Sequence, residues 1–265
     1  MPTKGIGACK LNIVYVLGST RSGTSAVRNA LAETKYKGYG EGHLVKILVD
    51  VVATVRTERS MGQGALILGN GLNALRERVL IRHFFHEYER YLTESLGSTF
   101  IMDKTPNIIP IQNAPDLASF HQNAMFLHCA RRHVDNIQSK LKKFPGQSFI
   151  SQCREWAECN LAWERVKSDL GERYVDFDFM DMVVKRQETC QRIGDLLGLT
   201  DAEVSAVVTY LENERPQSAD PSRDVNRFLK FSDMTWTDEE KEIFLRICAP
   251  VGDKMGHGLE TYYSA

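Results

Sequence analysis

The feature that most constrains this chain is a loop with a glycine at each end, placed between a strand-like and a helix-like segment. Residues 11–17 (LNIVYVL) form an almost continuous apolar run rich in β-branched side chains, which is typical of a strand buried on both faces of a parallel sheet. The run ends at Gly18, and after Gly23 apolar side chains recur at helical spacing. Such a loop directs backbone N–H groups and a helix N-terminus at an anion, which predicts a phosphate site.

The loop has the spacing of a nucleotide P-loop but lacks its lysine. Gly18 and Gly23 match that spacing, yet Thr24 stands where the lysine belongs, and the basic residue lies inside the loop at Arg21. Kinases rely on the lysine and on Mg²⁺ to offset the charge of a polyphosphate. The loop therefore favours a ligand with a single 5′-phosphoryl group, and a small-molecule kinase with a degenerate P-loop is the alternative.

The rest of the chain alternates strand and helix patterns. Further strands are predicted over 99–102, 124–129 and 173–177. Helices are predicted from residue 24 onward and over 74–96, 134–143, 152–170, 187–197, 201–214 and 238–254. This alternation predicts an α/β fold with a central parallel sheet flanked by helices in three layers.

Composition excludes several classes of protein. Lys plus Arg (33) and Asp plus Glu (34) give a net charge of −1, so a nucleic-acid partner is not expected and any anion site must be local. No stretch is apolar enough to span a bilayer, and no signal peptide precedes 11–17, so we expect a cytoplasmic protein unless an N-terminal membrane anchor lies outside this sequence. The cysteines show no disulfide or metal spacing and are interpreted as reduced thiols: Cys9, Cys129, Cys153, Cys159, Cys190 and Cys248.

Two arginines and a serine whose side chains suit an anion follow the strand at 124–129. Arg131 and Ser139 are eight residues apart, and an arginine fork suits a phosphate that a serine hydroxyl in the same strand–helix unit can share. The neighbouring Arg132 is the alternative to Arg131 for this role.

These two segments resemble the sulfotransferase superfamily. Arg-Ser-Gly-Thr-Ser after a strand is similar to the loop with which sulfotransferases bind the 5′-phosphosulfate of 3′-phosphoadenosine-5′-phosphosulfate, and an arginine with a serine eight residues on resembles their 3′-phosphate site. The resemblance implies that this donor is the co-substrate and that 3′,5′-adenosine bisphosphate is the product. It assigns the donor contacts to Arg21, Ser22, Gly23, Thr24, Ser25, Arg131 and Ser139.

The resemblance continues over most of the chain outside 45–96. Residues 179–182 and 195–199 are similar to the family's Tyr-Glu-Asp-Leu and Phe-Leu-Gly-Leu segments. Asn226-Arg227-Phe228 is similar to its Gly-Arg-Trp, which implies that Arg227 contacts the donor. Arg132 and His133 depart from the usual Asp/Asn-Pro.

The catalytic candidates follow from the same resemblance. Lys104, in Asp-Lys-Thr-Pro directly after a predicted strand, matches a lysine that contacts the transferred sulfuryl group, so Lys104 and Arg21 would flank that group. Tyrosylprotein-type and some bacterial members place a Gly-Glu element about twenty residues after the loop, which makes Glu41 the expected base. His43 is the alternative base.

A metal is not expected. His83 and His86 with Glu87 form an i, i+3 pair on a polar predicted helix and lack a third ligand in the sequence pattern, which is typical of a solvated face.

The sequence therefore predicts one sulfotransferase domain over 1–265, with 45–96 as a helical insertion facing the acceptor and 216–265 as a segment that closes over the donor. The expected reaction is in-line transfer to a hydroxyl or amine without a metal. Small molecules, carbohydrates, lipids and peptides all stay open as acceptors. A homodimer is one option for the assembly, and an inactive nucleotide-binding protein is a further alternative.

Overall fold

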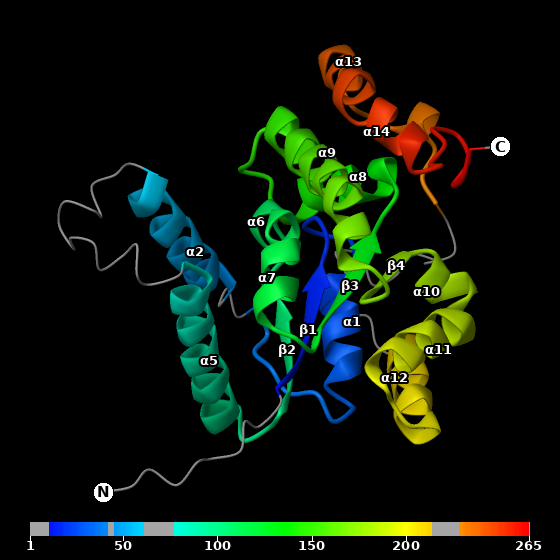
Figure 1. The fold of residues 1–265 in the computed structure, drawn as a ribbon. Helices are drawn as coiled ribbons and strands as arrows, with labels where there is room; N and C mark the ends of the chain where they lie inside the picture. Colours follow the sequence, from blue (N-terminus) through cyan, green and yellow to red (C-terminus); the bar gives the residue numbers. More distant parts are fainter. Residues whose placement is uncertain (1–10, 42–44, 61–76, 214–227, 265) are drawn as a thin grey trace, which may run out of the picture.

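The centre of the fold is a parallel sheet in which the strands follow the order β2-β1-β3-β4. The computed structural model describes residues 11–41, 45–60, 77–213 and 228–264. Within these residues the strands are Asn12–Leu17 (β1), Phe100–Lys104 (β2), Ala124–Ala130 (β3) and Tyr174–Asp178 (β4). Each lies within two residues of its predicted bounds, so the predicted parallel sheet is confirmed (Figure 1).

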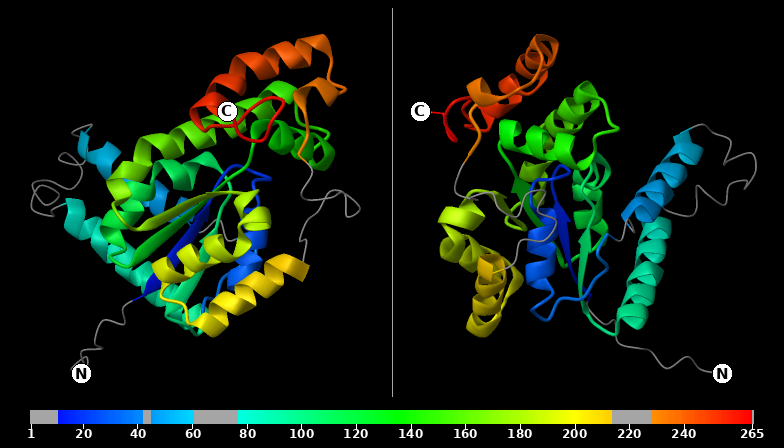
Figure 2. Two further views of the ribbon diagram at one scale, coloured as in Figure 1. Left: turned by 90° about the vertical axis from the view of Figure 1, so that its right-hand side faces the viewer. Right: turned by 180° about the vertical axis from the view of Figure 1, so that it is seen from behind.

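Helices cover both faces of this sheet, as the views from two sides show (Figure 2). One face carries α2 (Val45–Ser60), α5 (Glu77–Leu96), α6 (Ile108–Gln112), α7 (Ala114–Phe120) and α9 (Phe149–Val166). The other carries α1 (Thr24–Leu31), α11 (Arg186–Leu197) and α12 (Asp201–Asn213). The predicted arrangement of helices around a central sheet is confirmed.

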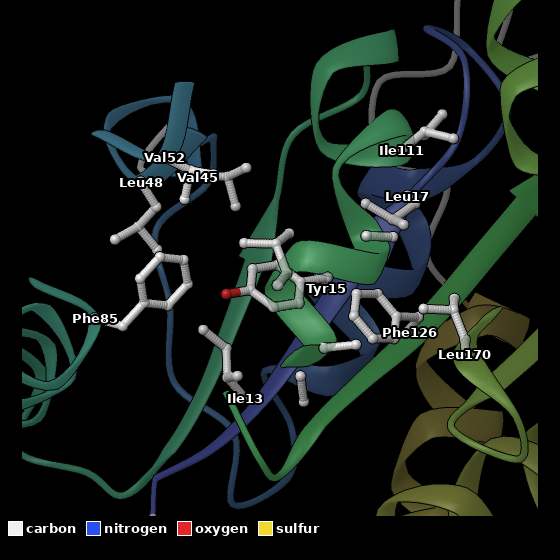
Figure 3. Packing of buried hydrophobic residues seen from close by; sticks show 14 of the residues in the cluster. Ile13, Tyr15, Leu17, Val45, Leu48, Val52, Phe85, Ile111, Phe126 and Leu170 are labelled. Carbon is white, nitrogen blue, oxygen red and sulfur yellow. The ribbon is translucent and has the colours of Figure 1, made fainter. Parts of the chain in front are cut away.

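The two covered faces explain the apolar run at the start of the chain. Tyr15 and Leu17 belong to the first core cluster, with Phe126 of β3 and Phe85 of α5 (Figure 3). Val16 belongs to the second cluster, under α1. Successive side chains of a strand point to opposite faces, so a strand covered on both faces is apolar at every position.

A third core cluster lies among α8 (His133–Lys143), α9, α13 (Asp238–Ile247) and α14 (Ala249–Lys254). The sequence predicts one helix over 238–254, whereas the structure has two that meet at Cys248. Pro250 in the first turn of α14 lacks the N–H that would continue the first helix, so the expectation of one helix was wrong.

Short helices lie between the longer elements. A 3-10 helix over Lys167–Leu170 follows α9, where the sequence predicts a continuous helix to residue 170. The others are α10 (Asp181–Val184) and a 3-10 turn at Phe231–Asp233. A capping box of Thr237 and Glu240 begins α13.

The strand order fixes where a ligand can bind. The chain leaves β1 for β2 on one side and then returns past β1 to β3 on the other. In open parallel sheets the connections diverge at such a switch point and leave a crevice at the carboxyl ends of the two strands. The loop 18–23 after β1 and residues 131–132 after β3 therefore meet at this point.

Candidate functional site

Both glycines of the loop after β1 occupy positions that exclude a side chain. Gly18 has φ of 148°, and a Cβ there would lie 2.4 Å from the carbonyl oxygen of Cys129 on the neighbouring strand. Gly23 has φ of 103°, and a Cβ would lie 2.7 Å from Cδ2 of Phe179. The loop thus needs glycine at both ends for its backbone conformation and for its close packing.

Hydrogen bonds from α8 and β3 hold the loop in shape. Asn136 of α8 donates from Nδ2 to Oγ of Ser19 at 3.2 Å and to the carbonyl oxygen of Thr20 at 3.0 Å. The loop closes on itself where Ser22 donates from Oγ to the Ser19 carbonyl at 2.7 Å. The thiol of Cys129 donates to the Ser22 carbonyl at 2.7 Å. The loop is a rigid turn and not an open strand-to-helix connection.

Arg21 joins the loop to the second predicted anion site. Its Nε donates to Oγ of Ser139 at 3.1 Å, and Nη1 of Arg131 donates to the Arg21 carbonyl oxygen at 3.1 Å. Burial lowers the pKa of the Arg21 guanidinium, and the positive charge of Arg131 lowers it further. Two guanidiniums and a hydroxyl therefore meet beside the loop, where an anion would relieve their repulsion.

Phe179 supports Arg131 from the next strand connection. The guanidinium carbon of Arg131 lies 4.6 Å from the centre of the Phe179 ring, a cation–π contact. Nε1 of Trp156 in α9 donates to the Arg131 carbonyl oxygen at 2.9 Å. The backbone and side chain of Arg131 are thus both held in place.

Lys104 and Glu41 form the other end of the site. Lys104 ends β2, and its Nζ donates to Oγ of Ser25 in the first turn of α1 at 3.2 Å and forms an ion pair with the Glu41 carboxylate. The Lys104 side chain is 1% exposed and that of Glu41 is 47% exposed. The sheet edge thus presents a buried cation and an accessible carboxylate at the same point.

A backbone pairing explains why Glu41 arrives there. The Lys37 amide donates to the Phe100 carbonyl oxygen at 2.9 Å, and the Met102 amide donates to the Lys37 carbonyl oxygen at 2.8 Å. The segment after α1 therefore begins along the edge of β2. Glu41, four residues beyond Lys37, consequently reaches Lys104 at the carboxyl end of that strand.

Comparison with known proteins identifies the family. The model of the sulfotransferase family matches residues 14–203, which is more than half of the chain and includes the loop, Glu41, Lys104 and the Arg131–Ser139 segment. This chain belongs to the sulfotransferase family.

One solved structure agrees in fold with this sulfotransferase, and two others are similar at lower scores. The sulfotransferase STF9 from Mycobacterium avium has a TM-score of 0.56 at 11% identity, over 95% of this chain and 78% of that one. The sulfotransferase domain of the Synechococcus PCC 7002 olefin synthase has a TM-score of 0.49 at 16% identity, over 89% and 95%. The sulfotransferase domain of the curacin biosynthetic pathway has a TM-score of 0.48 at 17% identity, over 96% and 93%. No curated protein sequence matches the chain.

The side chain of Arg132, the alternative phosphate ligand, contacts α8 and the C-terminal segment of the sulfotransferase. Its side chain is fully buried, and its Nε donates to Oδ2 of Asp135 at 2.8 Å. Its remaining nitrogens donate to the carbonyl oxygens of Leu229, Gly258 and Thr261. Arg132 therefore ties the C-terminal segment to α8.

Other candidates lie outside the site or outside the described residues. His43 and Arg227 fall in the ranges 42–44 and 214–227, which the structure does not describe. His83 and His86 are exposed on α5. In the described ranges, no group of three or more His, Cys, Asp or Glu residues is arranged to hold a metal ion. No helix of the described chain is long and apolar enough to cross a membrane.

Sequence reasoning missed the residues that support the loop. Asn136 and Lys140 lie one turn apart on α8, and Glu155 lies on α9. In the sequence pattern all three are polar positions of amphipathic helices. Asn136 and Lys140 are buried and Glu155 is half-buried, and only the packing of α8 and α9 reveals that these polar side chains lie near the loop.

Proposed function

We propose that this sulfotransferase transfers a sulfuryl group from 3′-phosphoadenosine-5′-phosphosulfate to a hydroxyl or amine of its acceptor. The observation that carries the proposal is the meeting of Arg21, Arg131 and Ser139 beside the glycine loop. A donor with phosphates at both ends of an adenosine needs two separate anion sites, and the loop and this cluster offer two.

The residues present fit such a donor. Gly18 and Gly23 at the two ends of the loop leave no room for a side chain, and the loop leads into the N-terminus of α1, where backbone N–H groups suit a phosphate. Burial, and secondarily the charge of Arg131, lowers the pKa of Arg21, and a bound anion would stabilise the charged form of its guanidinium. The contacts of Arg132 with Asp135 and three carbonyl groups favour Arg131 as the 3′-phosphate ligand.

Lys104 and Glu41 supply the chemical groups at the other end. The donor supplies the sulfuryl group and a phosphate leaving group. The Lys104 ammonium, next to Ser25 of α1, would stabilise negative charge on the transferred group, and Glu41 would accept the acceptor proton. The exposure of Glu41 leaves its carboxylate accessible to an acceptor, and the helices α2 and α5 of the segment 45–96 would bound the acceptor side.

Titration calorimetry of donor binding and an assay of label transfer together test the proposal. We expect 3′,5′-adenosine bisphosphate to bind without Mg²⁺ and labelled phosphosulfate donor to transfer its label to at least one class in an acceptor panel of carbohydrates, lipids, phenols and peptides. Binding of Mg-ATP in the absence of any affinity for the bisphosphate would contradict the proposal and favour a kinase. Binding of the bisphosphate without transfer to any acceptor would favour an inactive nucleotide-binding protein.

A further inference from the structure

A carboxylate on α9 contacts the phosphate loop. Oε1 of Glu155 accepts hydrogen bonds from the Thr20 amide at 2.9 Å and from Oγ1 of Thr20 at 2.8 Å. Glu155 is separated from Thr20 by 135 residues, so the contact is purely tertiary. A negative side chain beside an anion-binding loop would repel a phosphate unless its charge were offset.

Lys140 on α8 offsets that charge. Its Nζ forms an ion pair with Oε2 of Glu155 and donates to the Gln152 carbonyl oxygen at 3.2 Å. The Lys140 side chain is 3% exposed and that of Glu155 is 30% exposed. Such a pair costs desolvation, and removing one partner would leave the other charge poorly compensated.

The contact fixes the backbone immediately before Arg21. The Thr20 amide is held by Glu155, and the Thr20 carbonyl oxygen accepts from Asn136 at 3.0 Å. Arg21 then adopts φ of 67°, and it is the one non-glycine residue with positive φ in the described chain. This conformation is unfavourable for a residue with a side chain and persists only where surrounding contacts determine it.

We infer that Glu155, with its charge offset by Lys140, is a positioning residue for donor binding. It holds the Thr20–Arg21 backbone in the conformation that places the Arg21 guanidinium beside Ser139. Glu155 acts through Thr20 and does not itself contact the donor. The inference rests on the proposed donor site, because its effect on binding is exerted through Arg21.

Binding of 3′,5′-adenosine bisphosphate to the full chain, measured by calorimetry, tests this role. We expect Glu155→Ala to weaken binding about tenfold or more, since both bonds to Thr20 are lost. Glu155→Gln keeps an acceptor for Thr20, and combining it with Lys140→Met removes the uncompensated cation, so the double variant should bind within about threefold of the unaltered protein. Glu158→Gln, an exposed change on the same helix, is the matched control and should bind normally.

Two outcomes would overturn the positioning role while leaving the proposed function intact. One is unaltered bisphosphate affinity in Glu155→Ala. The other is a folded Glu155→Gln/Lys140→Met variant that binds as weakly as Glu155→Ala.

Amide hydrogen exchange tests the hold of Glu155 on the loop backbone without any ligand. In the ligand-free protein, Glu155→Ala should speed amide exchange over residues 18–25, whereas Glu158→Gln should not. Faster exchange supports the hold of Glu155 on the Thr20–Arg21 backbone even if the unaltered protein fails to bind the bisphosphate, a failure that would count against the proposed function. Exchange at the unaltered rate in Glu155→Ala overturns the role.

Discussion

Arg21 and Ser139, 118 residues apart in the sequence, are joined by a hydrogen bond of 3.1 Å from Nε to Oγ. This bond links the loop after β1 to the helix after β3. It places the guanidinium of Arg21 next to the hydroxyl of Ser139, and Nη1 of Arg131 donates to the Arg21 carbonyl oxygen at the same point.

Arg131→Ala should weaken binding of 3′,5′-adenosine bisphosphate. A hydrogen bond to a charged group is worth about 1.5–3 kcal/mol, so the dissociation constant should rise about ten- to a hundredfold. Calorimetry at constant salt measures this change. Arg246→Ala, which removes an exposed arginine of α13, should leave affinity unchanged, and equal affinity in both variants would refute the assignment of Arg131.

Arg132→Met should instead lower the free energy of unfolding. The guanidinium is buried and holds Asp135 together with three carbonyl groups of the C-terminal segment, so its removal should cost about 3–5 kcal/mol. Urea unfolding followed by circular dichroism gives the value. A stable variant that has lost bisphosphate affinity would show that Arg132, and not Arg131, is the phosphate ligand.

Glu41→Gln should abolish turnover while donor binding persists. Removal of a general base typically slows a reaction about 10²–10⁴-fold, and the amide cannot accept the acceptor proton. The measurements are single-turnover transfer of labelled sulfuryl group and bisphosphate affinity in the same variant. If Glu41→Gln turns over normally and His43→Asn does not, His43 is the base.

His133 should make stability depend on pH. Its ring packs against Trp156 and Phe244 at centroid distances of 5.6 and 5.0 Å, and neither ring nitrogen has a hydrogen-bond partner among the described residues. Burial, and secondarily the charges of His257 and Arg132, lower the pKa of His133 to about 3. The unfolded chain has the ordinary histidine pKa of about 6.5 and so binds a proton that the folded chain excludes.

The lower pKa of His133 in the folded chain makes the free energy of unfolding fall as the pH falls below about 6.5. As the pH falls from about 6.5 towards 3, His133 should lower the free energy of unfolding by at most about 1.4 kcal/mol per pH unit. His133→Phe should flatten the dependence in urea unfolding between pH 4.5 and 7, and His83→Phe, an exposed change, should not. Identical slopes in the two variants would contradict this account.

Local sequence patterns predicted the sheet and the loop well. The strand at 11–17 and the glycines at 18 and 23 are short-range features, because burial on both faces requires apolar side chains at every position and the tight loop requires glycine. The resemblance to sulfotransferases assigned Arg131 and Ser139 to the donor, because the two lie eight residues apart in one strand–helix unit.

Contacts between distant segments could not be predicted in the same way. The sequence favoured Arg131 and left Arg132 as the alternative, since adjacent arginines look alike until the C-terminal segment packs against one of them. It predicted that Lys104 and Arg21 flank one group, and that stays a prediction; the structure adds that Lys104 lies beside Glu41 and Arg21 beside Ser139.

The sequence by itself determined the α/β class, the glycine loop and the family, because each is written in consecutive or closely spaced residues. Only the tertiary structure decided which side chains support that loop. Glu155 and Lys140 lie on separate helices, and the packing of α8 and α9 pairs their charges and brings Glu155 to Thr20. Side-chain partnerships of this kind depend on the path of the chain through space, which no local pattern records.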